Sequence, residues 1–266
     1  MKKRRSDHFS GVAGHYASHR PGYPDALFTH LAGLAPGRAL AWDCAAGSGQ
    51  AGSGLAARFR QVVATDASHG QLAAGPGRPN VARWVAAAEA SGLPDESVDL
   101  IAVAQALHWF DLDRFYREAN RVLAPRGILA AWSYGVMKVD GREINHRVRR
   151  FYGKTVGPYW PPERCLVETG YRTLPFPFPE LESPGFAMEA NWTLPDLLGY
   201  LRSWSATGRY LAERGRDPVA GLEDELSPLW GDPAARRMVS WPLALRIGRK
   251  GPAAEPQGQA LGGPAE

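Results

Sequence analysis

The sequence has little cysteine and no long apolar run. Its 266 residues include two cysteines, Cys44 and Cys165, which are too few for a disulfide framework and are typical of proteins from a reducing compartment. No apolar stretch approaches the ~18 residues that identify a membrane-spanning helix. The basic residues Lys2–Arg5 lead into a polar stretch and not into the apolar centre of a secretory signal. We therefore expect a cytoplasmic protein with no membrane partner.

Dense basic clusters are also scarce, although the formal net charge is +4. Short basic runs occur at residues 2–5, 147–150 and 246–250, and no DNA- or RNA-recognition motif accompanies them. For this reason we expect no nucleic-acid partner. The positive balance suits an anionic small molecule equally well.

Strand-like apolar segments alternate with helix-like segments through the first half of the chain. Apolar residues recur at helical spacing from Leu112 to Leu123, behind Asp111, which is a suitable N-cap. Strands separated by helices in this way form a parallel, doubly wound sheet with right-handed crossovers. The strand candidates lie near residues 38–43, 61–66, 81–86, 98–104 and 127–133. The sequence thus predicts an α/β, Rossmann-like fold.

The loop after the first predicted strand carries the most specific motif. This strand ends at Asp43, and small residues that include Gly47 and Gly49 follow it. The second predicted strand ends at another acid, Asp66. A strand, glycine loop, helix, strand and acid together bind an adenosine-containing cofactor at the carboxyl edge of a parallel sheet. The small loop lets the cofactor lie against the backbone, and the acid accepts hydrogen bonds from ribose hydroxyls.

Two classes of cofactor use such a loop. Residues 47–52 spell G-x-G-x-x-G, the dinucleotide fingerprint, which is a weak signal by itself. Asp43 lies four residues before Gly47, where it would repel a pyrophosphate but attract the sulfonium and amino group of S-adenosylmethionine. We therefore favour a methyl donor. A nicotinamide-dependent oxidoreductase and a protein that binds S-adenosylmethionine without catalysis are the alternatives.

On these residues the chain resembles the class I S-adenosylmethionine-dependent methyltransferases, specifically the methyltransferase type 11 domain and its trans-aconitate methyltransferase-like branch. The resemblance spans approximately residues 8–250. The family motif is D-x-G-x-G-x-G, and here Ala45 replaces the first glycine of the motif. An alanine at that position is tolerable if its φ is negative and damaging if its φ is positive. The backbone conformation of Ala45 therefore bears on donor binding.

The resemblance also implies further contacts with the donor. Asp66 corresponds to the acid that binds the ribose, and Ala88 and Glu89 correspond to residues that contact the adenine. Gln105 opens the segment, up to Trp109, that closes over the methionine end of the donor. The donor-binding residues implied in this way are Asp43, Ala45, Gly47, Gly49, Asp66, Ala88, Glu89 and Gln105.

In fold, the resemblance implies a seven-stranded sheet of five parallel strands and an antiparallel edge pair, with a helical cap from the C-terminal half. Alternating residues over 186–192 and 241–247 are the candidates for the edge pair. The predicted organisation is a lid segment at 1–30, a donor-binding core at 31–135, cap helices with the last strands at 136–250, and a disordered tail at 251–266.

Methyl transfer makes modest demands on side chains, because holding both reactants in line in a dry pocket supplies much of the rate. A carboxylate acceptor needs no base, whereas a hydroxyl or an amine can require one. His108 is the candidate base, Trp109 a candidate cation–π partner of the sulfonium, and Arg20 a candidate clamp for a carboxylate. The structural alternatives for these residues are a hydrogen-bonded histidine, a packed tryptophan and a surface salt bridge.

The second half of the chain supplies candidate walls for an acceptor pocket. These candidates are Tyr159, Trp160, Arg164 and Trp204. The sequence does not place Arg147, Arg149 and Arg150 inside or outside that pocket. We predict an enzyme, monomeric or homodimeric and without a metal site, that methylates a small-molecule acceptor, with a carboxylate among the acceptor groups considered.

Overall fold

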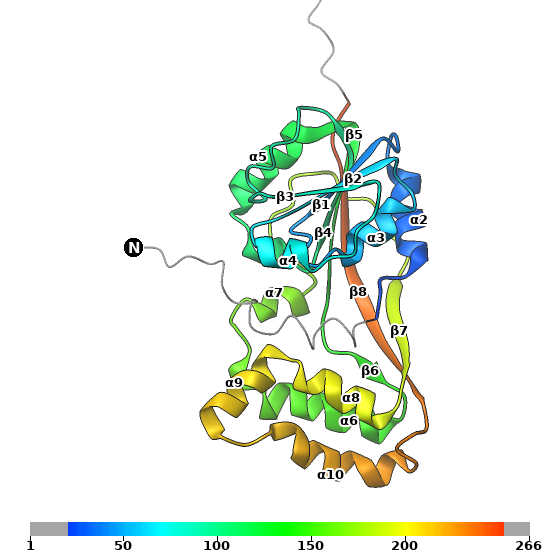
Figure 1. The fold of residues 1–266 in the computed structure, drawn as a ribbon, viewed down its shortest axis with the longest axis vertical. Helices are drawn as coiled ribbons and strands as arrows, with labels where there is room; N and C mark the ends of the chain where they lie inside the picture. Colours follow the sequence, from blue (N-terminus) through cyan, green and yellow to red (C-terminus); the bar gives the residue numbers. More distant parts are fainter. Residues whose placement is uncertain (1–20, 253–266) are drawn as a thin grey trace, which may run out of the picture.

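A computed structural model describes residues 21–252 of the chain. Figure 1 shows a twisted sheet with helices on both faces in one half of the molecule and a second group of helices in the other half. One long strand, β8 (Arg237–Arg249), runs through both halves. Within the described range, no helix is long and apolar enough to cross a membrane.

The parallel part of the sheet has the strand order β3-β2-β1-β4-β5. Its strands are β1 (Leu40–Cys44), β2 (Gln61–Asp66), β3 (Val81–Val85), β4 (Val98–Ala104) and β5 (Leu123–Tyr134). The chain moves outward from β1 to β3 and then returns to place β4 on the other side of β1. The loops after β1 and β4 therefore diverge at the carboxyl edge, where such sheets bind ligands. The five predicted strands and their parallel arrangement are confirmed.

An antiparallel edge follows β5, as predicted. β8 pairs antiparallel with β5, and β7 (Phe186–Trp192) pairs antiparallel with β8. The structure adds a two-residue strand, β6 (Lys138–Val139), which pairs with β8 beyond the end of β5. The sheet is therefore eight-stranded, and the prediction of seven strands is wrong by this one. A strand so short shows no alternation of apolar and polar residues, so the sequence pattern misses it.

Alternate residues of each strand face opposite sides of the sheet and form two buried layers. On β1, Ala41 packs in one layer and Trp42 in the other. The helices on the sheet are α2 (Asp25–Leu34), α3 (Gln50–Ala56), α4 (His69–Ala73) and α5 (Leu112–Val122). Asp111 caps α5 as predicted, because its Oδ1 accepts a hydrogen bond from the N–H of Arg114 at 3.3 Å.

The second group of helices has a buried core of its own. The helices of this group are α6 (Arg142–Arg150), the π-helix η2 (Phe151–Thr155), the 3-10 helix η3 (Gly157–Tyr159), α8 (Leu194–Arg202), α9 (Ser205–Arg214) and α10 (Pro218–Trp230). The short helix α7 (Arg164–Glu168) instead packs Val167 into the layer that contains Trp42. Val148 of α6, Leu201 of α8 and Leu222 of α10 share this core. Thr193 begins α8 in a capping box with Asp196.

Candidate functional site

The loop between β1 and α3 turns tightly because alternate residues have a positive φ. The φ values are +55° at Ala45, +55° at Gly47 and +83° at Gly49. A Cβ built on Gly47 would lie 3.9 Å from its nearest described neighbour, and one on Gly49 would lie 3.7 Å from its nearest. Both are ordinary van der Waals distances, so backbone conformation, and not crowding, requires these glycines.

Ala45 adopts the left-handed conformation that is unfavourable for an alanine. Its φ of +55° lies in the region that non-glycine residues enter at about 1–2 kcal/mol. The loop nevertheless keeps its hydrogen bonds, from the Ala46 N–H to Thr65 O and from the Gly49 N–H to Ala46 O, both at 2.9 Å. Ala45 is strained, but the loop is formed.

Gln105 is a second strained residue, at the end of β4. Its φ is +60°. Its N–H donates to Trp132 O at 2.9 Å and its Nε2 donates to Tyr134 O at 3.1 Å. Ala45 and Gln105 thus follow the adjacent strands β1 and β4, at the point where the crossovers diverge. Backbone strain of this kind concentrates at binding sites.

Asp66 joins the end of β2 to the glycine loop. Its Oδ2 accepts a hydrogen bond from the Gly47 N–H at 2.9 Å, and its Oδ1 accepts one from the Ser68 N–H at 2.8 Å. A carboxylate has about four lone-pair sites, so roughly two remain for a ligand. Asp66 therefore lies at the end of β2, as predicted, is fixed by two backbone N–H groups and can still accept hydrogen bonds.

Asp43 is fully buried beneath this loop. Neither carboxylate oxygen has a hydrogen-bond partner among the described residues, and Oδ2 would lie 2.9 Å from a Cβ on Gly52 of α3. Burial raises the pKa of Asp43 to about 7, and the negative charge of Asp66 adds to this increase. The backbone amide of Gly52 and the positive charge of Arg83 lower the pKa and partly offset the increase. Asp43 lies at the predicted place, but against α3 and without exposed surface.

The loop after β3 approaches the same edge of the sheet. The Ala86 N–H donates to Asp66 O at 3.2 Å. Ala88 is buried in the layer beneath α5, and the Oε1 of Glu89 accepts a hydrogen bond from the Asp111 N–H at 2.8 Å. Both predicted adenine-contact residues therefore lie beside the carboxyl edge, with Glu89 fixed against the start of α5.

His108 and Trp109 lie in the 3-10 helix η1 (Leu107–Trp109) after β4. The Nδ1 of His108 is 3.0 Å from the hydroxyl of Tyr171, and its ring centroid is 4.7 Å from that of Trp109. Burial, reinforced by the positive charge of Arg164, lowers the pKa of His108 to about 4. His108 is therefore neutral at neutral pH, and its Nε2 makes no hydrogen bond with another described residue.

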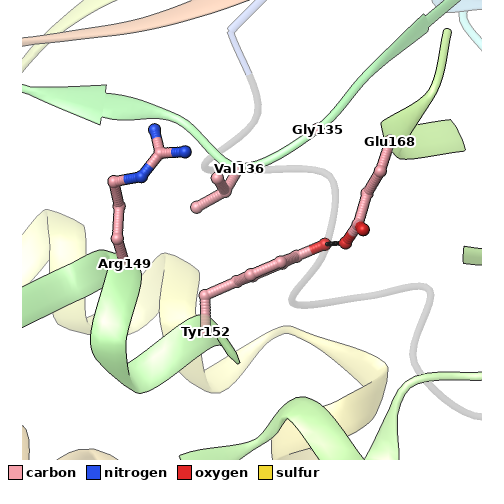
Figure 2. Close-up of a pocket in the computed structure, with 5 residues that line it drawn as sticks. All are labelled: Gly135, Val136, Arg149, Tyr152 and Glu168. Carbon is pink, nitrogen blue, oxygen red and sulfur yellow. Dashed lines mark hydrogen bonds between the residues drawn. The ribbon is translucent and has the colours of Figure 1, made fainter. Parts of the chain in front are cut away.

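A cavity of about 340 Å³ opens where the chain leaves β5. It is lined by Gly135, Val136, Arg149, Tyr152 and Glu168. Figure 2 shows Arg149 and Glu168 on opposite sides of it. Because Gln105 donates to the carbonyl of Tyr134, just before the cavity, the end of β4 adjoins this space.

Arg149 is the basic group of the cavity. Its neighbours Arg147 and Arg150 both pair with Glu225 of α10, at 3.1 and 2.6 Å. Two residues correspond to about 200° around an α-helix, so Arg149 lies on the opposite side of α6 from Arg147. Arg149 makes no ion pair or hydrogen bond with another described residue. The structure thus separates one cavity arginine from two structural ones.

Tyr152 is held between two charged side chains. Its hydroxyl accepts a hydrogen bond from Arg164 Nε at 2.6 Å and donates one to Oε1 of Glu168. The rings of Trp160 and Trp204 lie against it, with centroid distances of 5.2 and 5.5 Å. The predicted wall residues Arg164, Trp160 and Trp204 therefore support Tyr152 and are not themselves in the cavity lining.

Some sequence assignments fall elsewhere. Tyr159 is not part of the cavity lining, because its hydroxyl donates to Glu213 and accepts from Arg214 on α9. Tyr152 and Glu168 line the cavity, although no sequence motif marks them as site residues. Arg20, most of the lid predicted for residues 1–30, and the tail from residue 253 lie outside the described residues.

Comparison with known proteins adds three findings. Residues 42–131 match a family model described as a methyltransferase domain. A Dictyostelium discoideum protein named "Putative methyltransferase" is 34% identical over 83% of this chain and 85% of its own length. A solved structure, titled "Putative Type II Methyltransferase" from Anaeromyxobacter dehalogenans, is 47% identical, with a TM-score of 0.84 over 88% of this chain and 99% of that one.

Proposed function

Since this chain belongs to the class I S-adenosylmethionine-dependent methyltransferases, we propose that it methylates a small-molecule acceptor at the carboxyl edge of its sheet. The observation that carries the proposal is the loop after β1, where alternate residues have a positive φ and Asp66 of the next strand holds Gly47. The donor supplies an electrophilic methyl group when bound. The residues of this chain then need to bind, align and shield the reactants.

The loop and Asp66 fit such a donor on two counts. Gly47 and Gly49 have a positive φ and no side chain, so the donor would rest against bare backbone there. Asp66 retains lone pairs, which support its role as acceptor of the ribose hydroxyls. We assign Glu89 to the adenine end of the donor and Gln105 to the methionine end.

Asp43 acts through its charge in this proposal. It lies beneath the loop without a hydrogen-bond partner among the described residues, so direct contact does not explain an effect on the donor. A positive sulfonium above the loop favours the ionised carboxylate and lowers its pKa. Asp43 therefore attracts the donor more strongly than its uncharged product.

We assign the acceptor to the cavity beyond β5 and propose that it carries a carboxylate. The guanidinium of Arg149, which has no partner among residues 21–252, supports an anionic acceptor. His108, neutral at neutral pH, would accept a proton at Nε2 if the methylated group is a hydroxyl or an amine. Trp109, beside His108, is the proposed cation–π partner of the sulfonium.

The proposed organisation follows the two halves of the molecule. Residues 31–135 form the donor-binding core, and the helices within 136–250 cover the acceptor cavity. The assignment of residues 1–30 as a lid, the trans-aconitate methyltransferase-like branch, the cytoplasmic location and a monomeric or homodimeric state stay predictions. The non-catalytic and nicotinamide-dependent alternatives have no observation in their favour.

Calorimetric titration with S-adenosylhomocysteine, NADH and NADPH tests the donor class. We expect micromolar binding of S-adenosylhomocysteine alone. Binding of a dinucleotide instead would overturn the assignment. Transfer of label from methyl-tritiated donor to any member of an acceptor screen would then exclude a protein that only binds the donor.

A further inference from the structure

The cavity beyond β5 presents two groups of opposite charge that still have bonding capacity. Arg149 has no partner among the described residues, although the same helix carries two arginines that Glu225 neutralises. Unlike them, Arg149 lines the cavity, and none of the five N–H donors of its guanidinium bonds to another described residue. An unpaired cation in a partly enclosed site favours an anionic ligand.

Glu168 supplies the opposite charge across the cavity. Its Oε1 accepts a hydrogen bond from the hydroxyl of Tyr152 and lies 3.9 Å from Arg164 Nε. Its Oε2 makes no hydrogen bond with another described residue. An ionised carboxylate only accepts hydrogen bonds, so this free oxygen is complementary to an N–H or O–H donor on a ligand.

Tyr152 fixes Glu168 and separates the two charges. Burial raises the pKa of Tyr152 to about 12, so the phenol keeps its proton and its bond to Glu168. Figure 2 shows Val136 and Tyr152 between Arg149 and Glu168. The cavity therefore has a cationic end, an acceptor end and an apolar middle.

We propose that the methyl acceptor is a small amino acid or hydroxy acid, whose acidic group binds Arg149 and whose amine or hydroxyl donates to Glu168. This inference rests on the proposed function, because it takes the cavity as the acceptor site. The volume of about 340 Å³ is at the lower end of small-molecule pockets and suits a compact metabolite. A ligand with only the acid would leave Glu168 without a ligand contact, and a ligand with only the amine or hydroxyl would leave Arg149 without one.

Four ligands with one carbon skeleton test the proposal. Phenylalanine carries an acid and an amine, phenyllactate an acid and a hydroxyl, 3-phenylpropanoate the acid alone, and phenylalaninamide the amine alone. Dissociation constants are measured by calorimetry in the presence of S-adenosylhomocysteine. We expect the first two to bind roughly tenfold to a hundredfold more tightly than the last two, because each lost contact is a hydrogen bond to a charged group.

Variants assign each preference to its residue. Arg149→Gln should remove the preference for phenylalanine over phenylalaninamide, and Glu168→Gln the preference for phenylalanine over 3-phenylpropanoate. Arg142→Gln, an exposed position of the same helix, removes the same charge and should change neither. If Arg149→Gln does not fold, Arg149→Lys should retain part of the acid preference, because it keeps the charge and loses the planar fork.

Each other outcome overturns the inference. Equal affinity for the four ligands, no binding of any at millimolar concentration, or preferences that survive in both variants would all contradict it. Failure of the series in protein that binds S-adenosylhomocysteine refutes the acceptor class alone. Failure to bind S-adenosylhomocysteine refutes the proposed function. The dissociation constants of the four ligands then still test whether the cavity binds an acid together with an amine or hydroxyl.

Discussion

The carboxylate of Asp66 accepts a hydrogen bond from the backbone N–H of Gly47 at 2.9 Å. This bond joins the residue that ends β2 to the loop that follows β1. The acid and the glycine loop are therefore already joined, which lowers the ordering cost of binding.

Asp66→Ala should weaken binding of S-adenosylhomocysteine by about 1.5–3 kcal/mol, the scale of hydrogen bonds to a charged group. Calorimetric titration measures the change. Asp99→Ala is the matched control, because Asp99 also accepts two backbone N–H bonds, from Ala39 and Leu40, at the opposite end of β1. Equal losses of donor affinity in both variants would show a general effect on β1 and contradict a ribose contact.

Ala45→Gly should stabilise the protein. Relief of the left-handed alanine contributes about 1–2 kcal/mol, and the greater freedom of glycine in the unfolded chain offsets about 0.4–1 kcal/mol of it. We expect a net gain on the order of 0.5–1 kcal/mol in the free energy of unfolding, measured by denaturant titration. The neighbouring Ala46→Gly, where φ is not positive, should lose stability. A loss in both variants would mean that Ala45 is not strained.

Asp43 should make stability fall as the pH rises. Its pKa is about 7 in the folded protein, above the ordinary value of 3.8, so the folded chain holds a proton that the unfolded chain has released between those values. Relative to Asp43→Asn, the wild type should lose about 1–3 kcal/mol of unfolding free energy between about pH 5 and pH 8. Asp113→Asn, at an exposed position of α5, controls for the charge change. Parallel pH curves for the wild type and Asp43→Asn would rule out a buried, proton-holding carboxyl.

His108 should titrate near pH 4, below the ordinary histidine value of 6.5. The unfolded chain then binds a proton that the folded chain does not, so this residue favours the folded state above the ordinary value and loses that contribution as the pH falls toward 4. The Cε1–H resonance in an NMR titration, assigned by its loss in His108→Gln, measures the midpoint. A midpoint close to 6.5 would place the ring in water and contradict the burial of His108.

Local patterns were sufficient to predict the parallel sheet and the glycine loop after β1. An apolar run that ends in Asp43, small residues around Gly47 and Gly49, and a second run that ends in Asp66 lie close together in the chain. Each of these features depends on backbone sterics or on strand burial, which neighbouring residues determine. The sequence also marked Gln105 and His108 as the segment after β4, and the structure places both there.

Long-range packing decided the remainder. The positive φ of Ala45 depends on the conformation of the whole loop. Arg147 and Arg150 both form ion pairs with Glu225, which is distant in the sequence. The cavity draws Arg149 from α6 and Glu168 from α7, and only folding brings these elements to the end of β5. The sequence by itself determined the fold and the glycine loop that Asp66 holds, because both depend on short-range periodicity and glycine sterics. The tertiary structure decided which charges are neutralised and which face the cavity, because that depends on side chains distant in sequence.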